Sequence, residues 1–197
     1  MKIKFDSTFF LKSVSDISQL DIFNGIEVAF VGATNSGKST TINCIANKRK
    51  ISRTSKIPGR TQLINFFEVT NNFRLVDLPG YGFSKVSKLI KRKIEILIFN
   101  YLNSRKCLIG LVLIMDIRNP LKSSDLKMIL FAIKKNIKIL ILLNKSDKVS
   151  ISFQKKQCLI IKNYIFSISK FIKIYIFSSL KKNGIDNLKK ELEKWNK

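Results

Sequence analysis

Residues 32–39 read Gly-Ala-Thr-Asn-Ser-Gly-Lys-Ser, which fits the pattern G-x-x-x-x-G-K-[ST] of a phosphate-binding P-loop. Residues 27–31 upstream predict a short buried strand, and residues 39–47 downstream predict a helix. A strand that leads into a glycine-rich loop and then into a helix is the setting in which this motif binds phosphate. A chance glycine turn is the alternative, and the flanking elements argue against it.

The residue types in this motif predict the chemistry of a nucleotide. Glycines let backbone N–H groups approach phosphate oxygens without a Cβ in the way. We expect Lys38 to reach the β- and γ-phosphates and the Ser39 hydroxyl to bind Mg²⁺. The other nucleotide contacts expected from this segment are Gly32, Asn35, Ser36, Gly37 and Thr40.

Length and composition restrict the class of protein. The 197 residues predict a single domain over residues 25–197, preceded by a polar extension over residues 1–24. No predicted segment is long and apolar enough to span a membrane, and charges interrupt any N-terminal signal peptide, so we expect a cytoplasmic protein with no membrane partner. Without histidine, imidazole catalysis is excluded. The isolated Cys44, Cys107 and Cys158 are interpreted as small buried hydrophobic residues.

The charge is strongly positive. Lys and Arg number 37 against 13 Asp and Glu, which gives a formal net charge of +24. One explanation is a nucleic-acid partner. The other is the codon usage of an AT-rich genome, because only seven of the 37 basic residues are arginine and the chain is also rich in Ile, Asn and Phe. The charge supports contact with RNA without proving it.

Alternating apolar patterns predict the fold. Strands are expected at 27–31, 63–70, 73–78, 108–116, 137–143 and 173–177, with helices at 86–103, 123–135 and 153–167. Asn71-Asn72 predicts a tight hairpin. A last helix would place Ile185, Leu188, Leu192 and Trp195 on one apolar face. We therefore predict a three-layer α/β P-loop domain, with a mostly parallel six-stranded sheet, one antiparallel edge strand and helices on both faces.

Three further motifs follow predicted strands, where ligands bind in such folds. In Asp77-Leu78-Pro79-Gly80 we expect Asp77 to hold Mg²⁺ through water and the Gly80 N–H to contact the γ-phosphate. Each of these motifs alone is also typical of an ordinary turn or polar loop, but together they follow the order found in GTPases.

The other two motifs would contact the base. In Asn144-Lys145-Ser146-Asp147 the Asp147 carboxylate would accept hydrogen bonds from guanine N1–H and N2–H₂, and the Lys145 stem would lie on the base plane. Adenine offers no such pair of donors, so an ATPase is disfavoured. Ser178 and Ser179 would offer a backbone N–H to guanine O6.

Four strings carry a resemblance to a known family: P-G-R-T-Q-L-I-N-F-F at 58–67, D-L-P-G-Y-G-F at 77–83, D-I-R-N-P-L at 116–121 and F-S-S-L-K-K-N-G-I-D at 177–186. They resemble the EngB (YihA/YsxC) family of TRAFAC GTPases over residues 25–195. The resemblance implies a bacterial GTPase needed for assembly of the large (50S) ribosomal subunit, and older assignments link the family to division septum formation. Its implied partners are GTP, GDP, and the large-subunit precursor with its rRNA, and we expect a monomer.

The polar basic loop over residues 48–60 is a candidate switch segment, and we expect GTP and Mg²⁺ to order residues 50–63 and 80–90. The resemblance implies that Thr61 is the switch threonine. Thr61 would ligate Mg²⁺ together with Ser39, with Gly59 and Arg60 beside the nucleotide; Thr54 and Ser55 are rival hydroxyls. Two departures from the family pattern are Ala33-Thr34, where Arg-Ser is usual, and Asn119, where His is usual.

The expected catalytic residues are Lys38, Thr61 and Asn35. Tyr81 stands where many GTPases have a water-positioning Gln, so we expect slow hydrolysis without a partner or an ion. Related GTPases with Asn at this place in the loop use it to bind K⁺ beside the phosphates; an Asn that only stabilises the loop is the alternative. An RNA-binding module with negligible hydrolysis is the alternative to a GTPase switch. The basic residues that follow the second switch are candidate rRNA contacts: Lys85, Lys88, Lys91, Arg92 and Lys93.

Overall fold

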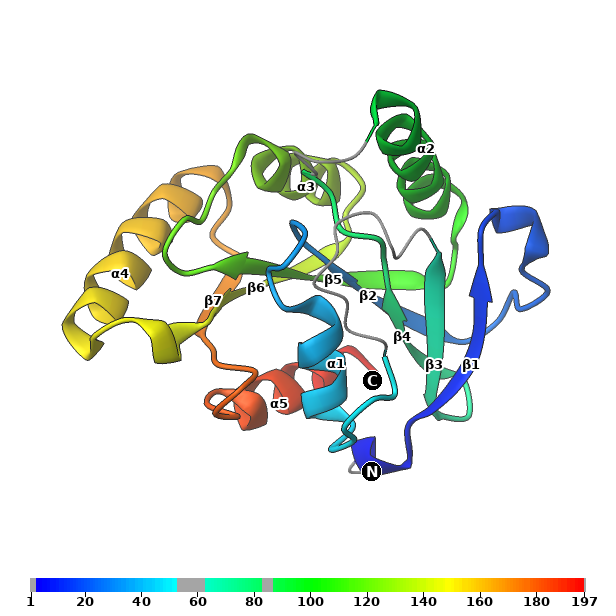
Figure 1. The fold of residues 1–197 in the computed structure, drawn as a ribbon, viewed down its shortest axis with the longest axis horizontal. Helices are drawn as coiled ribbons and strands as arrows, with labels where there is room; N and C mark the ends of the chain where they lie inside the picture. Colours follow the sequence, from blue (N-terminus) through cyan, green and yellow to red (C-terminus); the bar gives the residue numbers. More distant parts are fainter. Residues whose placement is uncertain (1–2, 53–62, 83–86, 197) are drawn as a thin grey trace.

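A seven-stranded sheet forms the centre of the protein (Figure 1). The computed structural model describes residues 3–52, 63–82 and 87–196. The strands are β1 (Phe9–Val14), β2 (Ile26–Val31), β3 (Ile64–Thr70), β4 (Phe73–Asp77), β5 (Leu108–Asp116), β6 (Lys138–Asn144) and β7 (Lys173–Ile176). Their order is β1-β3-β4-β2-β5-β6-β7. Strands β4, β2, β5, β6 and β7 are parallel, and β3 pairs antiparallel with both β4 and β1.

The predicted three-layer α/β class is confirmed, but the sheet has one strand more than predicted in the residues described. The additional strand β1 lies within the segment predicted as an extension, and it occupies the edge beside β3. Phe9 and Phe10 are about half exposed, and the register shifts between Phe10 and Lys12. Because the strand is irregular and neither face is fully buried, its residues lack the apolar pattern that would predict a strand.

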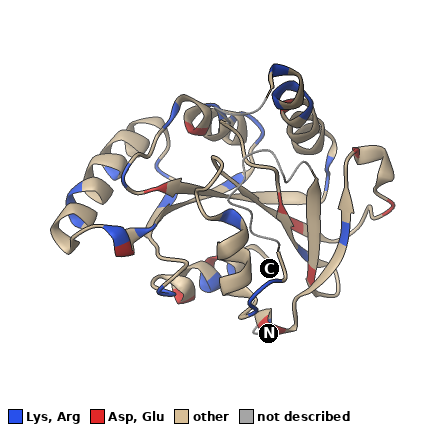
Figure 2. Ribbon diagram, in the orientation of Figure 1, with Lys and Arg blue, Asp and Glu red and all other residues tan. Residues whose placement is uncertain are grey.

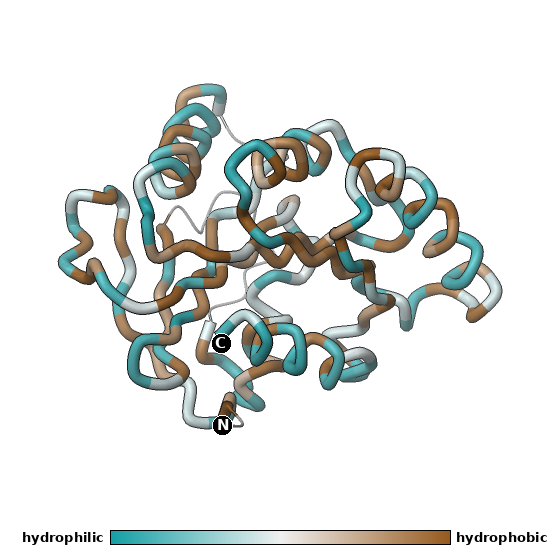
Figure 3. Tube along the Cα trace, turned by 180° about the vertical axis from the view of Figure 1, so that it is seen from behind, coloured by the Kyte–Doolittle hydropathy of each residue, from teal (hydrophilic) through white to brown (hydrophobic). Residues whose placement is uncertain are grey.

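Helices cover both faces of the sheet. One face carries α1 (Lys38–Ile45) and α5 (Ile185–Trp195), and the other carries α2 (Lys88–Ser104), α3 (Ser123–Lys134) and α4 (Ile151–Ile168) (Figure 1). Three short 3₁₀ turns span Phe5–Ser7, Ile17–Gln19 and Ser146–Lys148. Figure 3 shows apolar residues running continuously along the central strands, whereas polar and apolar residues alternate along the helices. Among the described residues no helix has the length and apolar character of a membrane span.

Several local predictions are confirmed. The last helix buries Leu188 and Leu192 completely, and Ile185 and Trp195 pack beside them. Asn72 adopts a positive φ of 71° in the hairpin between β3 and β4, a conformation that asparagine tolerates. The three cysteines are free and buried. The apolar periods in the sequence therefore place these helices, strands and turns correctly.

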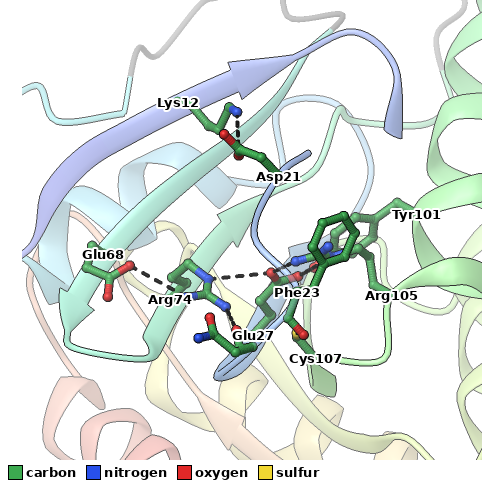
Figure 4. A network of polar contacts seen from close by, with 10 residues as sticks. Lys12, Asp21, Phe23, Glu27, Glu68, Arg74, Tyr101, Arg105 and Cys107 are labelled. Atoms are coloured by element: carbon green, nitrogen blue, oxygen red, sulfur yellow. Dashed lines mark hydrogen bonds and ion pairs between the residues drawn. The ribbon is translucent and has the colours of Figure 1, made fainter. Parts of the chain in front are cut away.

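A buried ionic cluster lies near the start of β2, at the opposite end of that strand from the P-loop (Figure 4). Glu27 is fully buried, and its carboxylate accepts hydrogen bonds from Tyr101 Oη at 3.0 Å and Arg105 Nε at 3.1 Å. Arg74 Nε lies 3.5 Å from Glu27 Oε1, and Arg74 Nη1 lies 3.8 Å from Glu68 Oε2. These contacts join β2 to β4 and to the end of α2.

Candidate nucleotide-binding site

The loop between β2 and α1 has the backbone of a phosphate-binding turn. Gly32 and Gly37 have φ of +148° and +106°, values that residues with a Cβ rarely adopt. A Cβ at Gly32 would collide with the carbonyl of Ile114, and one at Gly37 would collide with the side-chain amide of Asn144. Both glycines are therefore required by close approach as well as by φ. Asn35, at the exposed tip of the loop, also has a positive φ of 62°.

Lys38 folds back over this loop. Its Nζ donates hydrogen bonds to the carbonyls of Gly32 at 2.9 Å and Ala33 at 3.3 Å. Burial lowers the pKa of Lys38 to about 8, although the carboxylates of Asp77 and Asp125 act in the opposite direction. A Cβ at Gly80 would lie 3.0 Å from Lys38 Nζ, so the backbone of the Asp77–Gly80 motif closely approaches this ammonium group.

A carboxylate and two hydroxyls meet beside the lysine. Asp77, at the end of β4, accepts hydrogen bonds at Oδ2 from Ser39 Oγ at 2.7 Å and Ser52 Oγ at 2.8 Å. Burial raises the pKa of Asp77, against the effect of Lys38 and the two hydroxyls. Asp77 Oδ1 is buried and has no hydrogen-bond partner among the described residues. A carboxylate oxygen and a hydroxyl are ligands that Mg²⁺ prefers, so Ser39 and Asp77 fit a magnesium site.

The side chain of Asn144 joins the P-loop to the loop after β7. Its Nδ2 donates to the carbonyl of Ser36 at 2.7 Å, and its Oδ1 accepts from the backbone N–H of Ser179 at 3.0 Å. Next to this link, Ser178 Oγ donates to Asp147 Oδ1 at 2.5 Å. This hydrogen bond, more than the opposing effect of burial, lowers the pKa of Asp147. The two base motifs and the phosphate loop are thus in direct contact.

Lys145 is held by a residue to which the sequence analysis assigned no role. Its backbone is left-handed, with φ of 64°, and its Nζ lies 3.0 Å from Asp116 Oδ2 at the end of β5. Arg118 binds the same carboxylate through Nε at 2.9 Å and Nη2 at 2.6 Å. Although burial raises the pKa of Asp116, the hydrogen bonds from Arg118 and Lys145 hold it well below the usual range. The position of Asp116 at a strand end was the signal that could have identified it.

Tyr81 is bound on the side of α3. Its hydroxyl donates to Asp125 Oδ1 at 2.8 Å, and its backbone carbonyl accepts from Thr34 N at 2.9 Å. Burial, together with Asp125, raises the pKa of Tyr81 well above its usual value. The phenol is packed in the core and hydrogen-bonded there.

The structure brings most of the predicted site residues into one place. The Lys38 ammonium group contacts the carbonyls of Gly32 and Ala33 and lies close to Gly80. Ser39 bonds to Asp77, and Asn144 connects Ser36 of the P-loop to Ser179, next to the Ser178–Asp147 hydrogen bond. Thr40 is half-buried in the first turn of α1. The predictions for Thr54, Ser55, Gly59, Arg60, Thr61 and Lys85 lie outside the described residues.

Comparisons with known proteins agree with this arrangement. Residues 27–145 match the family model of the 50S ribosome-binding GTPase. A probable GTP-binding protein EngB of Buchnera aphidicola subsp. Schizaphis graminum is 50% identical, covering 98% of this chain and 96% of its own. One from Salmonella paratyphi B is 45% identical, covering 98% and 92%.

Solved structures show the same fold. The crystal structure of a probable GTP-binding protein engB superposes with a TM-score of 0.70 and 23% identity, covering 86% of this chain and 98% of that one. A variant of Aquifex aeolicus Era bound to GDP.AlF4- superposes with a TM-score of 0.68 and 22% identity, covering 86% and 56%.

Proposed function

Because the chain belongs to the EngB family of P-loop GTPases, we propose that it is a Mg²⁺-dependent GTP switch in assembly of the large ribosomal subunit. The nucleotide site is supported by the Asn144 side chain, which connects the P-loop to the Ser178-Ser179 loop beside Asp147. The ribosomal role is supported by the match of residues 27–145 to the model of the 50S ribosome-binding GTPase. We further propose a monomer in the cytoplasm, with the large-subunit precursor and its rRNA as partners.

The phosphate end of the site binds and neutralises charge. On nucleotide binding, Lys38 would exchange the carbonyls of Gly32 and Ala33 for β- and γ-phosphate oxygens, since an ammonium group prefers an anionic acceptor. Backbone N–H groups of the P-loop and of Gly80 would contact the phosphates. Ser39 and Asp77 would hold Mg²⁺ with Thr61, and the bound ion neutralises charge that develops on the phosphates.

The base end selects guanine. The Asp147 carboxylate is fixed by Ser178 and stays ionised, so it can accept two hydrogen bonds from guanine. Asp116 holds the Lys145 side chain at the other side of this loop, which supports its proposed place along the base plane. The Ser178-Ser179 loop would complete the pocket around guanine O6.

The candidate rRNA contacts in α2 are compatible with this function. Lys88, Lys91, Arg92 and Lys93 are exposed on the first two turns of α2, which begins within the predicted second switch segment. Figure 2 shows, however, that Lys and Arg are spread over helices on both faces of the sheet. The placement of these residues at the end of the switch segment, rather than the total charge, therefore favours α2 as the rRNA contact.

Co-sedimentation with large-subunit precursor particles tests the switch. We expect more protein to sediment with the particles in the presence of a non-hydrolysable GTP analogue than with GDP, and binding to weaken with added salt. Binding that does not depend on the nucleotide would contradict a switch. It would favour the RNA-binding module, for which the core-bound Tyr81 is the supporting observation.

Replacing KCl by NaCl at equal ionic strength tests the role proposed for Asn35. If Asn35 helps to bind K⁺, GTP turnover should fall roughly tenfold or more in NaCl, because a positive charge held at the phosphates stabilises the transition state and a site that fits K⁺ holds the smaller Na⁺ less well. Asn35→Ala should remove the difference between the salts. Equal wild-type rates in both salts would leave Asn35 as a residue that only stabilises the loop.

A further inference from the structure

Ser52, near the start of the predicted switch segment over residues 50–63, contacts the candidate magnesium carboxylate although none of the nucleotide-binding motifs includes it. Its hydroxyl donates to Asp77 Oδ2 at 2.8 Å, and both residues are only 1% exposed. Ser52 is 25 residues from Asp77 in the sequence and belongs to no helix or strand. Because Ser52 is so far from Asp77 in the sequence and belongs to no regular element, other contacts must hold its hydroxyl beside the carboxylate.

Asn43 in α1 holds Ser52 from both sides of its backbone. The Ser52 N–H donates to Asn43 Oδ1 at 2.7 Å, and Asn43 Nδ2 donates to the Ser52 carbonyl at 2.9 Å. Asn43 is 7% exposed and lies on the same helix as Ser39. The P-loop helix therefore supplies one hydroxyl to Asp77 directly and fixes a second one through Asn43.

Both hydroxyls donate to the same carboxylate oxygen. Ser39 and Ser52 occupy Oδ2 from two directions, which restricts rotation of the carboxylate about its Cβ–Cγ bond. The other oxygen, Oδ1, keeps its lone pairs for a ligand as far as the described residues show. Preorganisation of this kind is what supports a metal ligand from outside the coordination sphere.

We propose that Ser52, held by Asn43, is a positioning residue that fixes the Asp77 carboxylate for magnesium. The inference rests on the proposed magnesium site and adds to it a residue that does not itself touch the ion. The same contact would also suit an opposite role. If the Ser52 hydroxyl bonded to Asp77 only while no metal was bound, it would compete with Mg²⁺ for the carboxylate. Loss of the Ser52 hydroxyl would weaken Mg²⁺ binding in the first role and strengthen it in the second.

The test is the Mg²⁺ dependence of GDP release, measured with fluorescently labelled GDP in buffers of defined free Mg²⁺. Removing one hydrogen bond to the carboxylate with Ser52→Ala should raise the Mg²⁺ concentration needed for half-maximal slowing of release by roughly three- to tenfold. Release in EDTA should equal that of the wild type, because Ser52 acts only through the metal carboxylate. Asn43→Ala should shift the Mg²⁺ requirement in the same direction.

Thr8→Ala is the matched control. Thr8 is fully buried, and its hydroxyl donates to the Phe5 carbonyl at 2.5 Å, remote from Asp77 in the chain. The Thr8→Ala substitution should lower the melting temperature without changing the Mg²⁺ concentration needed for half-maximal slowing of GDP release. An unchanged or lower requirement in Ser52→Ala would overturn the inference. If Mg²⁺ did not slow release from the wild type at all, the proposed magnesium site itself would be wrong.

Discussion

Replacing Asp147 by Asn is expected to move the preference of the site from guanine to xanthine nucleotides. A carboxylate accepts from guanine N1–H and N2–H₂, whereas an amide can donate to the O2 that xanthine carries in place of the amino group. A buried mismatch leaves polar groups unpaired, so we expect GDP affinity to fall by about 100-fold or more and xanthosine diphosphate to become the tighter ligand. Competition against fluorescently labelled nucleotides measures both affinities.

Ser178→Ala is the control for this exchange. It removes the 2.5 Å hydrogen bond that orients Asp147 and leaves the carboxylate in place. Affinity should fall for GDP, while the preference for guanine over xanthine is kept. If Asp147→Asn lowered the affinity for both bases equally, Asp147 would have a structural role, and the guanine assignment would fail.

Replacing Glu27 by Gln should cause a large loss of stability. The substitution keeps the shape of the side chain but leaves Arg74 and Arg105 buried without their shared anion. Breaking a buried pair in this way costs about 3–5 kcal/mol. Urea unfolding measures the change in the free energy of unfolding, provided that the m-value is the same for both proteins.

Glu68→Gln is the matched control within the same cluster. Glu68 lies 3.8 Å from Arg74 and is more exposed than Glu27, so its loss should cost below about 1 kcal/mol. The nucleotide affinity of folded Glu27→Gln protein should remain that of the wild type, because the cluster lies at the other end of β2 from the P-loop. If Glu27→Gln lost as little stability as Glu68→Gln, groups other than the Glu27 carboxylate would be balancing the charges of the buried arginines.

Sequence motifs predicted which residues form the site because each has a fixed local geometry. The glycines of the P-loop and the acid after β4 follow directly from strand-loop-helix spacing, and the structure brings them together as expected. Contacts between distant segments have no such spacing. Nothing in the sequence pairs Ser52 with Asp77, Tyr81 with Asp125 or Asp116 with Lys145.

The same difference explains the missed strand. Continuous apolar runs such as Leu108–Asp116 predict a buried central strand, because both faces of the sheet are covered there. The edge strand β1 depends on a partner strand 50 to 59 residues away in the sequence, and exposed side chains such as Phe9 show no apolar period. Tertiary pairing, rather than local pattern, decides whether such a segment is a strand.

The amide of Asn144 has a consequence for ligand fragments. The Asn144 side chain bonds both to the Ser36 carbonyl and to the Ser179 N–H, so the distance between the P-loop and the Ser178-Ser179 loop is set before a nucleotide binds. Guanosine alone and pyrophosphate alone would each bind to one of two loops whose separation is already set, although pyrophosphate would still have to draw Lys38 from the carbonyls of Gly32 and Ala33. The intact nucleotide would then gain affinity from the covalent link between its base and its phosphates, in addition to any contribution from the switch segments.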